Sequence, residues 1–276
     1  MPEYINKIRT ASGDLPINYE ALANLPTISN PNLLINSDFR NPINQRGETN
    51  YSIPAYTYTI DRWKVLSKEA TLSVNDGYIK LSSIAGPSYF IQKFESIPVN
   101  DYVTVSINVK SVTGVINVYV GSTEKEECFS IYSAGIATYT TSVKFTDFIQ
   151  LNIEAVNDAQ VELYWAKAEL GSTATQFVPR LYDEELIFCR RYYRKYWTSM
   201  LFPQFYQNQY CGFMFDVPMR KDPTVKTFSI LSTSNNSSIG QSVEVYAQGV
   251  YKFHVTSGYA EKAVLVPMLE LDAEIY

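Results

Sequence analysis

Apolar and polar residues alternate with a period of two from Leu33 to about Arg180. Within 70–83, apolar residues at every second position flank the turn residues Asn-Asp-Gly at 75–77, which predicts a β-hairpin with one buried face. The same alternation recurs in segments 103–109, 116–120, 149–153 and 161–165. No long helical pattern interrupts these strands, so a parallel sheet of βαβ units is excluded. The sequence predicts an all-β sandwich over this region.

After Pro179 the periodicity becomes helical. Asp183 is a suitable N-cap, acidic residues follow it in the first turn and basic residues crowd the far end, an order that complements the helix dipole. We therefore predict a connecting helix of about three turns within 181–198. Its apolar face would consist of Leu186, Cys189, Tyr193 and Trp197, which recur at spacings of three and four.

From Tyr210 onward the period of two returns, which predicts a second, smaller β-sandwich. A length of 276 residues fits two globular units with a short extension. The extension is the proline-rich N-terminal segment, in which 17–26 has the pattern of one or two helical turns. The expected division is an arm at 1–31, a first sandwich at 32–180, the helix at 181–198 and a C-terminal β-sandwich tip at 199–276.

The composition is that of a folded protein, with 46% hydrophobic and 18% charged residues and 22 tyrosines. A net charge of −5 argues against nucleic acid as a partner, because phosphate binding depends on clustered lysine and arginine. No segment approaches the roughly 20 apolar residues that span a bilayer, so we expect no membrane insertion. The first residues do not have the pattern of a signal peptide, so we expect the protein to stay in the cytoplasm until assembly or release.

Catalytic patterns are scarce. The chain has a single histidine, His254, and no nucleotide-binding, esterase or zinc-protease motif. Three cysteines without CxxC spacing, Cys128, Cys189 and Cys211, indicate reduced and mostly buried thiols rather than a disulfide framework or a zinc site. We expect no metal, no cofactor and no enzyme activity.

A pair of carboxylates for glycoside hydrolysis cannot be found from sequence spacing, so that chemistry stays open. The acidic run Glu124, Glu126 and Glu127 is the obvious loop candidate, although such runs usually form solvated turns.

Sugar binding requires aromatic faces beside amides or carboxylates, and two clusters provide both. The first consists of Asn44, Gln45, Tyr51, Tyr56 and Tyr58, and the second of Tyr206, Asn208, Gln209 and Tyr210. Tyrosine is also an ordinary strand and interface residue, so a purely structural role remains an alternative for each cluster.

Two stretches frame the central sandwich: NLLINSDFRNPINQRG at 32–47, followed by YTIDRW at 58–63, and ELGSTATQFVPRLYDEELIFCRRYY at 169–193. Together they resemble the two segments that flank the jelly-roll module in tail-fibre and other receptor-binding proteins of bacteriophages. The segments at 17–26, 218–225 and 271–276 resemble other parts of the same tail proteins. The chain departs from the common pattern at Ser37, where glycine is expected, and at Tyr276, an additional final residue.

The resemblance implies a virion protein whose residues 1–31 attach to other tail or baseplate proteins, with a jelly roll in the middle and a β tip at the far end. It implies a homotrimer, made in the host cytoplasm, that binds a bacterial surface glycan non-covalently during host attachment. It also assigns Trp63 and Trp165 to the core. Two alternatives remain open: a structural virion component (baseplate, collar or head fibre) that binds no sugar, and a depolymerase that cleaves surface polysaccharide.

Overall fold

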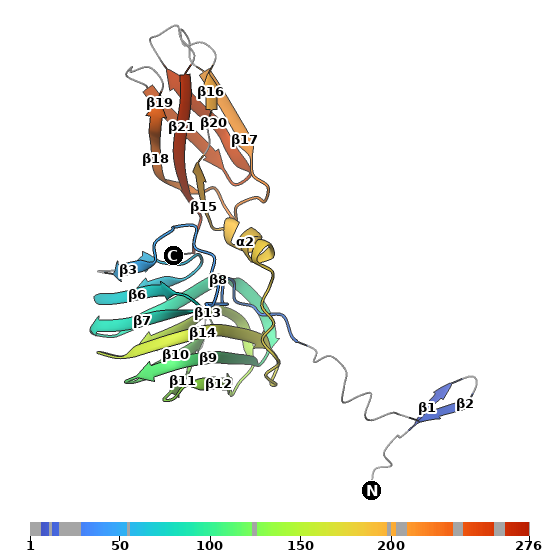
Figure 1. The fold of residues 1–276 in the computed structure, drawn as a ribbon. Coiled ribbons are helices and arrows are strands. Elements are labelled where there is room, and N and C mark those ends of the chain that lie inside the picture. The colour runs from blue at the N-terminus through green and yellow to red at the C-terminus, as the bar shows by residue number, and fades with distance from the viewer. Residues whose placement is uncertain are drawn as a thin grey trace.

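The chain is all-β, with a jelly-roll sandwich, a short helix and a smaller unit of two sheets (Figure 1). The computed structural model describes residues 7–10, 13–16, 29–53, 56–122, 126–197, 200–202, 209–233, 240–256 and 263–275. This architecture confirms the fold class expected from the sequence. In the N-terminal segment, β1 (Lys7–Thr10) and β2 (Gly13–Pro16) form a hairpin, and the helical turns expected at 17–26 lie outside the described residues.

The jelly roll consists of two six-stranded antiparallel sheets. The first sheet has the order β11 (Glu126–Ile131), β10 (Ile116–Gly121), β13 (Phe145–Ala155), β8 (Ser88–Asp101), β5 (Lys64–Leu66) and β4 (Thr57–Tyr58). The second has the order β12 (Gly135–Thr140), β9 (Val103–Thr113), β14 (Gln160–Leu170), β7 (Tyr78–Ala85), β6 (Glu69–Asn75) and β3 (Asn50–Ile53). The predicted hairpin is β6–β7, and Gly77 in its turn has the positive φ of 81° that favours glycine.

The core lies between the two sheets, where every second side chain of a strand points inward. Along β9, for example, Val103, Val105 and Ile107 are fully buried. The centre is aromatic: the ring of Trp63 stacks on Phe90 at 4.4 Å and Phe39 meets Trp63 edge-on at 5.2 Å. The indole Nε1 of Trp63 donates to the carbonyl of Asn36 at 2.8 Å, so its one polar atom is satisfied. Trp63 therefore occupies the core as expected.

Trp165 lies outside this core, contrary to the sequence expectation. The register of β14 against β9 shifts between Leu163 and Trp165, because a β-bulge adds one residue at that point. Trp165 consequently turns to the outer face of the sheet, opposite Asn108. It is only 8% exposed, because Phe177 stacks on its ring at 4.6 Å with an interplanar angle of 2°.

The connecting helix is shorter than predicted. Helix α2 (Tyr182–Arg190) is followed by strand β15 (Tyr193–Trp197), so the helix expected over 181–198 ends at its midpoint. Leu181, not Asp183, is the N-cap residue, and Asp183 lies in the first turn. The aromatic residues of β15 favour a strand, and pairing with β21 (Ala263–Asp272) satisfies its backbone. Tyr193 and Trp197 thus belong to a sheet rather than to a helix face.

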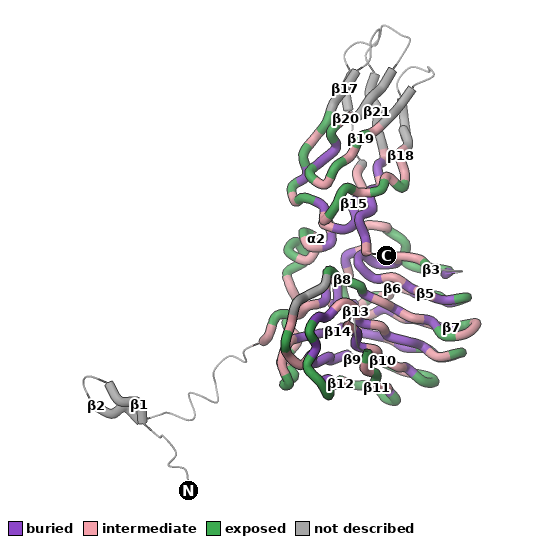
Figure 2. Tube along the Cα trace, turned by 180° about the vertical axis from the view of Figure 1, so that it is seen from behind, coloured by how far each residue is buried: buried purple, intermediate pink, exposed green. Residues whose placement is uncertain are grey.

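The C-terminal unit has two sheets with a small core between them. One contains β15, β21, β16 (Met200–Phe202) and β18 (Thr224–Thr233), and the other contains β17 (Gln209–Met214), β20 (Gly249–Thr256) and β19 (Gly240–Tyr246). Its buried residues include Phe215, Met219, Val250, Leu269 and Leu271. In Figure 2, the residues of this unit drawn as buried include those of β15 beside α2.

Candidate functional site

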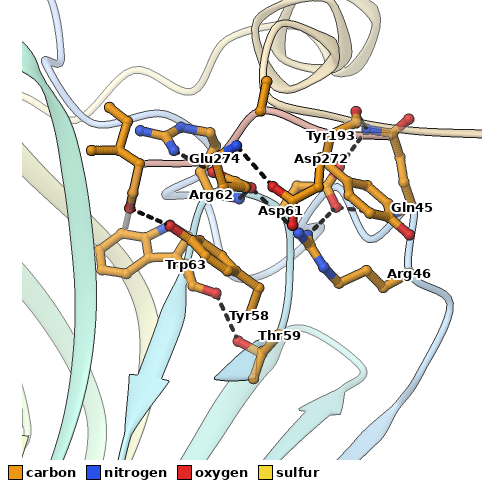
Figure 3. A network of polar contacts seen from close by, with 12 residues as sticks. Gln45, Arg46, Tyr58, Thr59, Asp61, Arg62, Trp63, Tyr193, Asp272 and Glu274 are labelled. Atoms are coloured by element: carbon orange, nitrogen blue, oxygen red, sulfur yellow. Dashed lines mark hydrogen bonds and ion pairs between the residues drawn. The ribbon is translucent and has the colours of Figure 1, made fainter. Parts of the chain in front are cut away.

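The jelly roll and the C-terminal unit meet through buried charges (Figure 3). Arg62, in a jelly-roll loop, pairs with Glu274, which follows β21, at 2.5 Å between Nη1 and Oε2, and both side chains are 0% exposed. The same carboxylate accepts the backbone N–H of Arg62 at 3.2 Å. Arg62 has a φ of +70°, which is rare for a residue with a large side chain. The tertiary contacts of its amide and side chain hold this conformation in place.

A second carboxylate, Asp61, lies beside this pair. It accepts hydrogen bonds from the backbone N–H of Gln45 at 3.2 Å and from the side-chain amide of Gln45 at 2.6 Å. Arg46 bridges Asp61 at 3.2 Å and Glu274 at 3.4 Å, and its guanidinium lies 3.9 Å from the ring centroid of Tyr193. Four charged side chains and a tyrosine thus connect the two units.

Burial raises the pKa of Asp61 to about 6, and the positive charge of Arg46 opposes this shift. A carboxyl group with a raised pKa in the folded state is accommodated best when protonated, so its contribution to stability is fully present below the unfolded pKa near 4. That contribution is lost as the pH rises through 6.

We therefore expect the free energy of unfolding to fall between about pH 4 and pH 6.5 by an amount on the order of 2–3 kcal/mol that depends on Asp61. Asp61→Asn should flatten this part of the stability curve, measured by urea denaturation at a series of pH values. Asp158→Asn is the matched control, because Asp158 is exposed and its φ of 62° suits asparagine. Equal pH profiles for the wild type and Asp61→Asn would contradict the expectation.

A cavity of about 500 Å³ opens beside this network, between the jelly roll and the C-terminal unit. We call it the junction cavity. The jelly roll contributes Arg46, Glu48, Tyr51, Tyr56, Thr57 and Tyr58, and the C-terminal unit contributes Tyr193, Lys226, Glu270 and Asp272. Tyr56 is 68% exposed, with Lys64 Nζ 4.7 Å from its ring centroid. The cavity therefore combines an accessible aromatic face with charged groups of both signs.

The three tyrosines of the first predicted cluster line this cavity in different ways. Tyr51 is buried, and its hydroxyl donates to Asn44 Oδ1 at 2.8 Å. Burial raises the pKa of Tyr51 to about 12. Tyr58 donates to the carbonyl of Ile275 at 2.5 Å, which connects the jelly roll to the end of the chain. Tyr56 is thus the tyrosine of this cluster with the most accessible ring.

The two predicted amides have structural roles instead. Asn44 donates to the carbonyl of Glu48 at 2.6 Å within its own loop. Gln45 donates to both Asp61 and the carbonyl of Tyr193. Neither residue lines the junction cavity. In the second predicted cluster, Tyr206 and Asn208 lie outside the described residues, and for Gln209 and Tyr210 only the strand backbone is described.

Sequence reasoning missed the half of the cavity that the C-terminal unit supplies. The sequence pattern places Tyr193 on a helix face and gives no signal for Lys226, Glu270 or Asp272. These residues are separated by well over a hundred positions from the first cluster, so no local pattern connects them. Only the antiparallel pairing of β15 and β18 with β21 brings these four residues together at one side of the cavity.

The acidic loop has a structural role where it is described. Glu127 accepts hydrogen bonds from the Tyr139 hydroxyl and from the backbone of Ser142 and Val143. Glu126 accepts from Gln150, and Glu124 lies outside the described residues. In the part of the chain that the structure describes, no group of three histidine, cysteine or acidic side chains could hold a metal ion.

Of the cysteines, Cys189 is buried and Cys128 is exposed, so the expectation of mostly buried thiols fails at Cys128. Cys211 is described only as backbone. In the described ranges, no helix is long and apolar enough to cross a membrane.

No protein-family model and no curated protein matches this chain. Among solved structures, a variant of CBM29-2, from work on ligand recognition by family 29 carbohydrate-binding modules, is 16% identical with a TM-score of 0.30. The match covers 49% of this chain and 100% of that module. Discoidin II from Dictyostelium discoideum is 10% identical with a TM-score of 0.26, covering 71% of this chain and 81% of that one. The fold described above follows from the strand pairing of the chain itself.

Proposed function

We propose that this protein is a bacteriophage tail-fibre or receptor-binding subunit that recognises a bacterial surface glycan non-covalently. The convergence of three tyrosines and several charged side chains in the junction cavity is the observation that carries the proposal. The exposed ring of Tyr56 offers a face on which the C–H side of a pyranose can stack. The carboxylate of Glu48 at the rim is an acceptor for sugar hydroxyls.

The virion context of the proposal depends on the resemblance of 32–47, 58–63 and 169–193 to phage tail proteins. In this proposal residues 1–31 attach the subunit to other tail or baseplate proteins, and the subunits form a homotrimer. Several linked copies would multiply a weak affinity of each site for its glycan.

Tyr56→Ala is expected to weaken retention of the purified protein on bacterial cells by about tenfold or more, because it removes the exposed stacking face of the cavity. Retention is measured on a panel of strains, together with the release of new reducing ends. Tyr132→Ala is the matched control, since Tyr132 is 75% exposed in the turn between β11 and β12, away from the cavity. It should bind like the wild type.

Strain-specific retention without new reducing ends supports the receptor-binding function. The appearance of new reducing ends would favour the depolymerase alternative. Absence of retention on every strain would favour a structural virion component. If Tyr56→Ala and Tyr132→Ala bind equally well, glycan contact lies outside the junction cavity.

A further inference from the structure

A second hollow, of about 520 Å³, lies on the outer face of the jelly roll. We call it the sheet groove. Its floor is formed by β12, β9 and β14, and one wall is formed by the segment 171–180, which we call the strap. The register aligns Ile136, Asn108 and Trp165 in one row across the three strands. The groove therefore begins where the β-bulge turns Trp165 outward.

A buried ion pair fixes the strap on the sheet. Lys167 and Glu169, at most 1% exposed, lie 3.1 Å apart on the outer face of β14. Glu169 accepts the backbone N–H of Thr175 at 2.9 Å and its hydroxyl at 2.5 Å. Lys167 donates to the carbonyl of Gln176 at 3.0 Å. These charges are compensated by each other and by the strap, so the wall of the groove is held in a defined position.

The groove has an apolar side and a polar side. Trp165 and Phe177 form a parallel aromatic stack, and Ile136, 63% exposed, extends the apolar surface. Asn108 and Gln176 line the same hollow, and neither side-chain amide forms a hydrogen bond with another described residue. Each amide can both donate to and accept from a hydroxyl group.

The charge of the groove is balanced. Its one charged lining residue, within the described part of the chain, is Arg40. The guanidinium of Arg40 forms two hydrogen bonds with Asp38, at 2.7 and 2.9 Å, and lies 5.8 Å from the centroid of Phe177. The groove therefore offers stacking and amide groups without a net charge, unlike the junction cavity with its several charged residues.

We infer that the sheet groove is a second carbohydrate-binding site, specific for an uncharged pyranose chain. The inference rests on the proposed function of glycan recognition and adds a separate site with its own sugar class. Ile136 and the accessible part of Phe177, whose other face is backed by Trp165, pack against the C–H face of the sugar, and Asn108 and Gln176 bind its hydroxyl groups.

The test uses the tryptophan at the site. The full chain is titrated with neutral hexasaccharides of glucose, mannose or galactose, and with oligosaccharides of uronic acids, while tryptophan fluorescence and heat of binding are recorded. Saturable binding of at least one neutral hexasaccharide is expected, with a fluorescence change that Trp165→Phe abolishes, because Trp63 is shielded in the core and Trp197, the third tryptophan, lies in β15 and not in the groove lining. The double variant Asn108→Ala/Gln176→Ala should bind at least tenfold more weakly.

The control variant is Tyr251→Ala, because Tyr251 is 77% exposed in β20 and lines neither the sheet groove nor the junction cavity; it should keep the affinity for the neutral hexasaccharide. Tyr56→Ala changes the junction cavity alone and tells the two sites apart. Absence of binding by every neutral hexasaccharide overturns the inference, as does stronger binding of uronic-acid oligosaccharides. Equal loss of affinity in Tyr56→Ala would place the neutral sugar in the junction cavity and also overturn it. Retention on cells is measured in parallel, so failure of the sheet groove with retention intact leaves the proposed function standing.

Discussion

Glu274→Ala is expected to lower the free energy of unfolding by about 3–5 kcal/mol, the usual effect of removing one partner from a buried ion pair. Arg62 would keep its charge at 0% exposure and lose its partner at 2.5 Å. The backbone N–H of Arg62 would lose its acceptor as well. Arg46 would still have Asp61 as a partner. The change is measured by urea denaturation followed by circular dichroism.

Glu244→Ala provides the matched control, since Glu244 pairs with Lys252 at 3.4 Å on the surface, where their side chains are 49% and 38% exposed. An exposed pair of this kind contributes less than about 1 kcal/mol. Replacing both members of the buried pair, with Arg62→Met and Glu274→Leu together, should recover part of the loss because no charge then remains without a partner. Similar losses for Glu244→Ala and Glu274→Ala would show that the buried Arg62–Glu274 pair stabilises the fold no more than an exposed ion pair does.

Trp63→Ala is the second large effect, with an expected loss of about 3–5 kcal/mol in the free energy of unfolding. The indole is fully buried, and its removal leaves a void beside Phe39 and Phe90 that the two sheets cannot easily close. The carbonyl of Asn36 also loses its hydrogen bond from Nε1. Denaturation followed by circular dichroism measures this loss independently of tryptophan fluorescence.

Trp165→Ala serves as the comparison, since Trp165 is nearly as buried but lies on the outer face of the sheet against Phe177. Phe177 and solvent can fill its place, so a smaller loss than for Trp63→Ala is expected. Equal losses for the two variants would mean that Trp165 contributes to the core as much as Trp63 does.

The sequence predicted those parts of the fold that depend on local periodicity. The strands at 70–83, 103–109 and 116–120 could be identified because one buried face requires an apolar residue at every second position. The position of Trp165 could not be predicted, because a β-bulge reverses the alternation without leaving a glycine or proline in the sequence.

The end of α2 was mispredicted for a related reason. Tyr193 and Trp197 fit a helical period with Leu186 and Cys189, yet they pair with Asp272 and Met268 of β21, 79 and 71 positions later. Tertiary pairing outweighed a periodicity that also suited a helix. The same limit applies to the candidate site, where the sequence identified the tyrosines of the jelly roll but not the residues of β18 and β21 that complete the junction cavity.

Glu274 also has a consequence for the order of events during synthesis. Arg62 is separated from Glu274 by 212 residues, so the ribosome has completed the whole jelly-roll sequence and most of the C-terminal unit before the partner of Arg62 appears. The entropy cost of closing a loop grows only logarithmically with the length of the loop, so the long separation of Arg62 and Glu274 costs little free energy. Its main effect is that the pair forms late. Until Glu274 has been synthesised, the guanidinium of Arg62 must remain hydrated, and the loop that contains Arg62 stays more exposed than in the folded protein. The jelly roll of a nascent chain is thus expected to acquire its final junction surface among the last steps of folding.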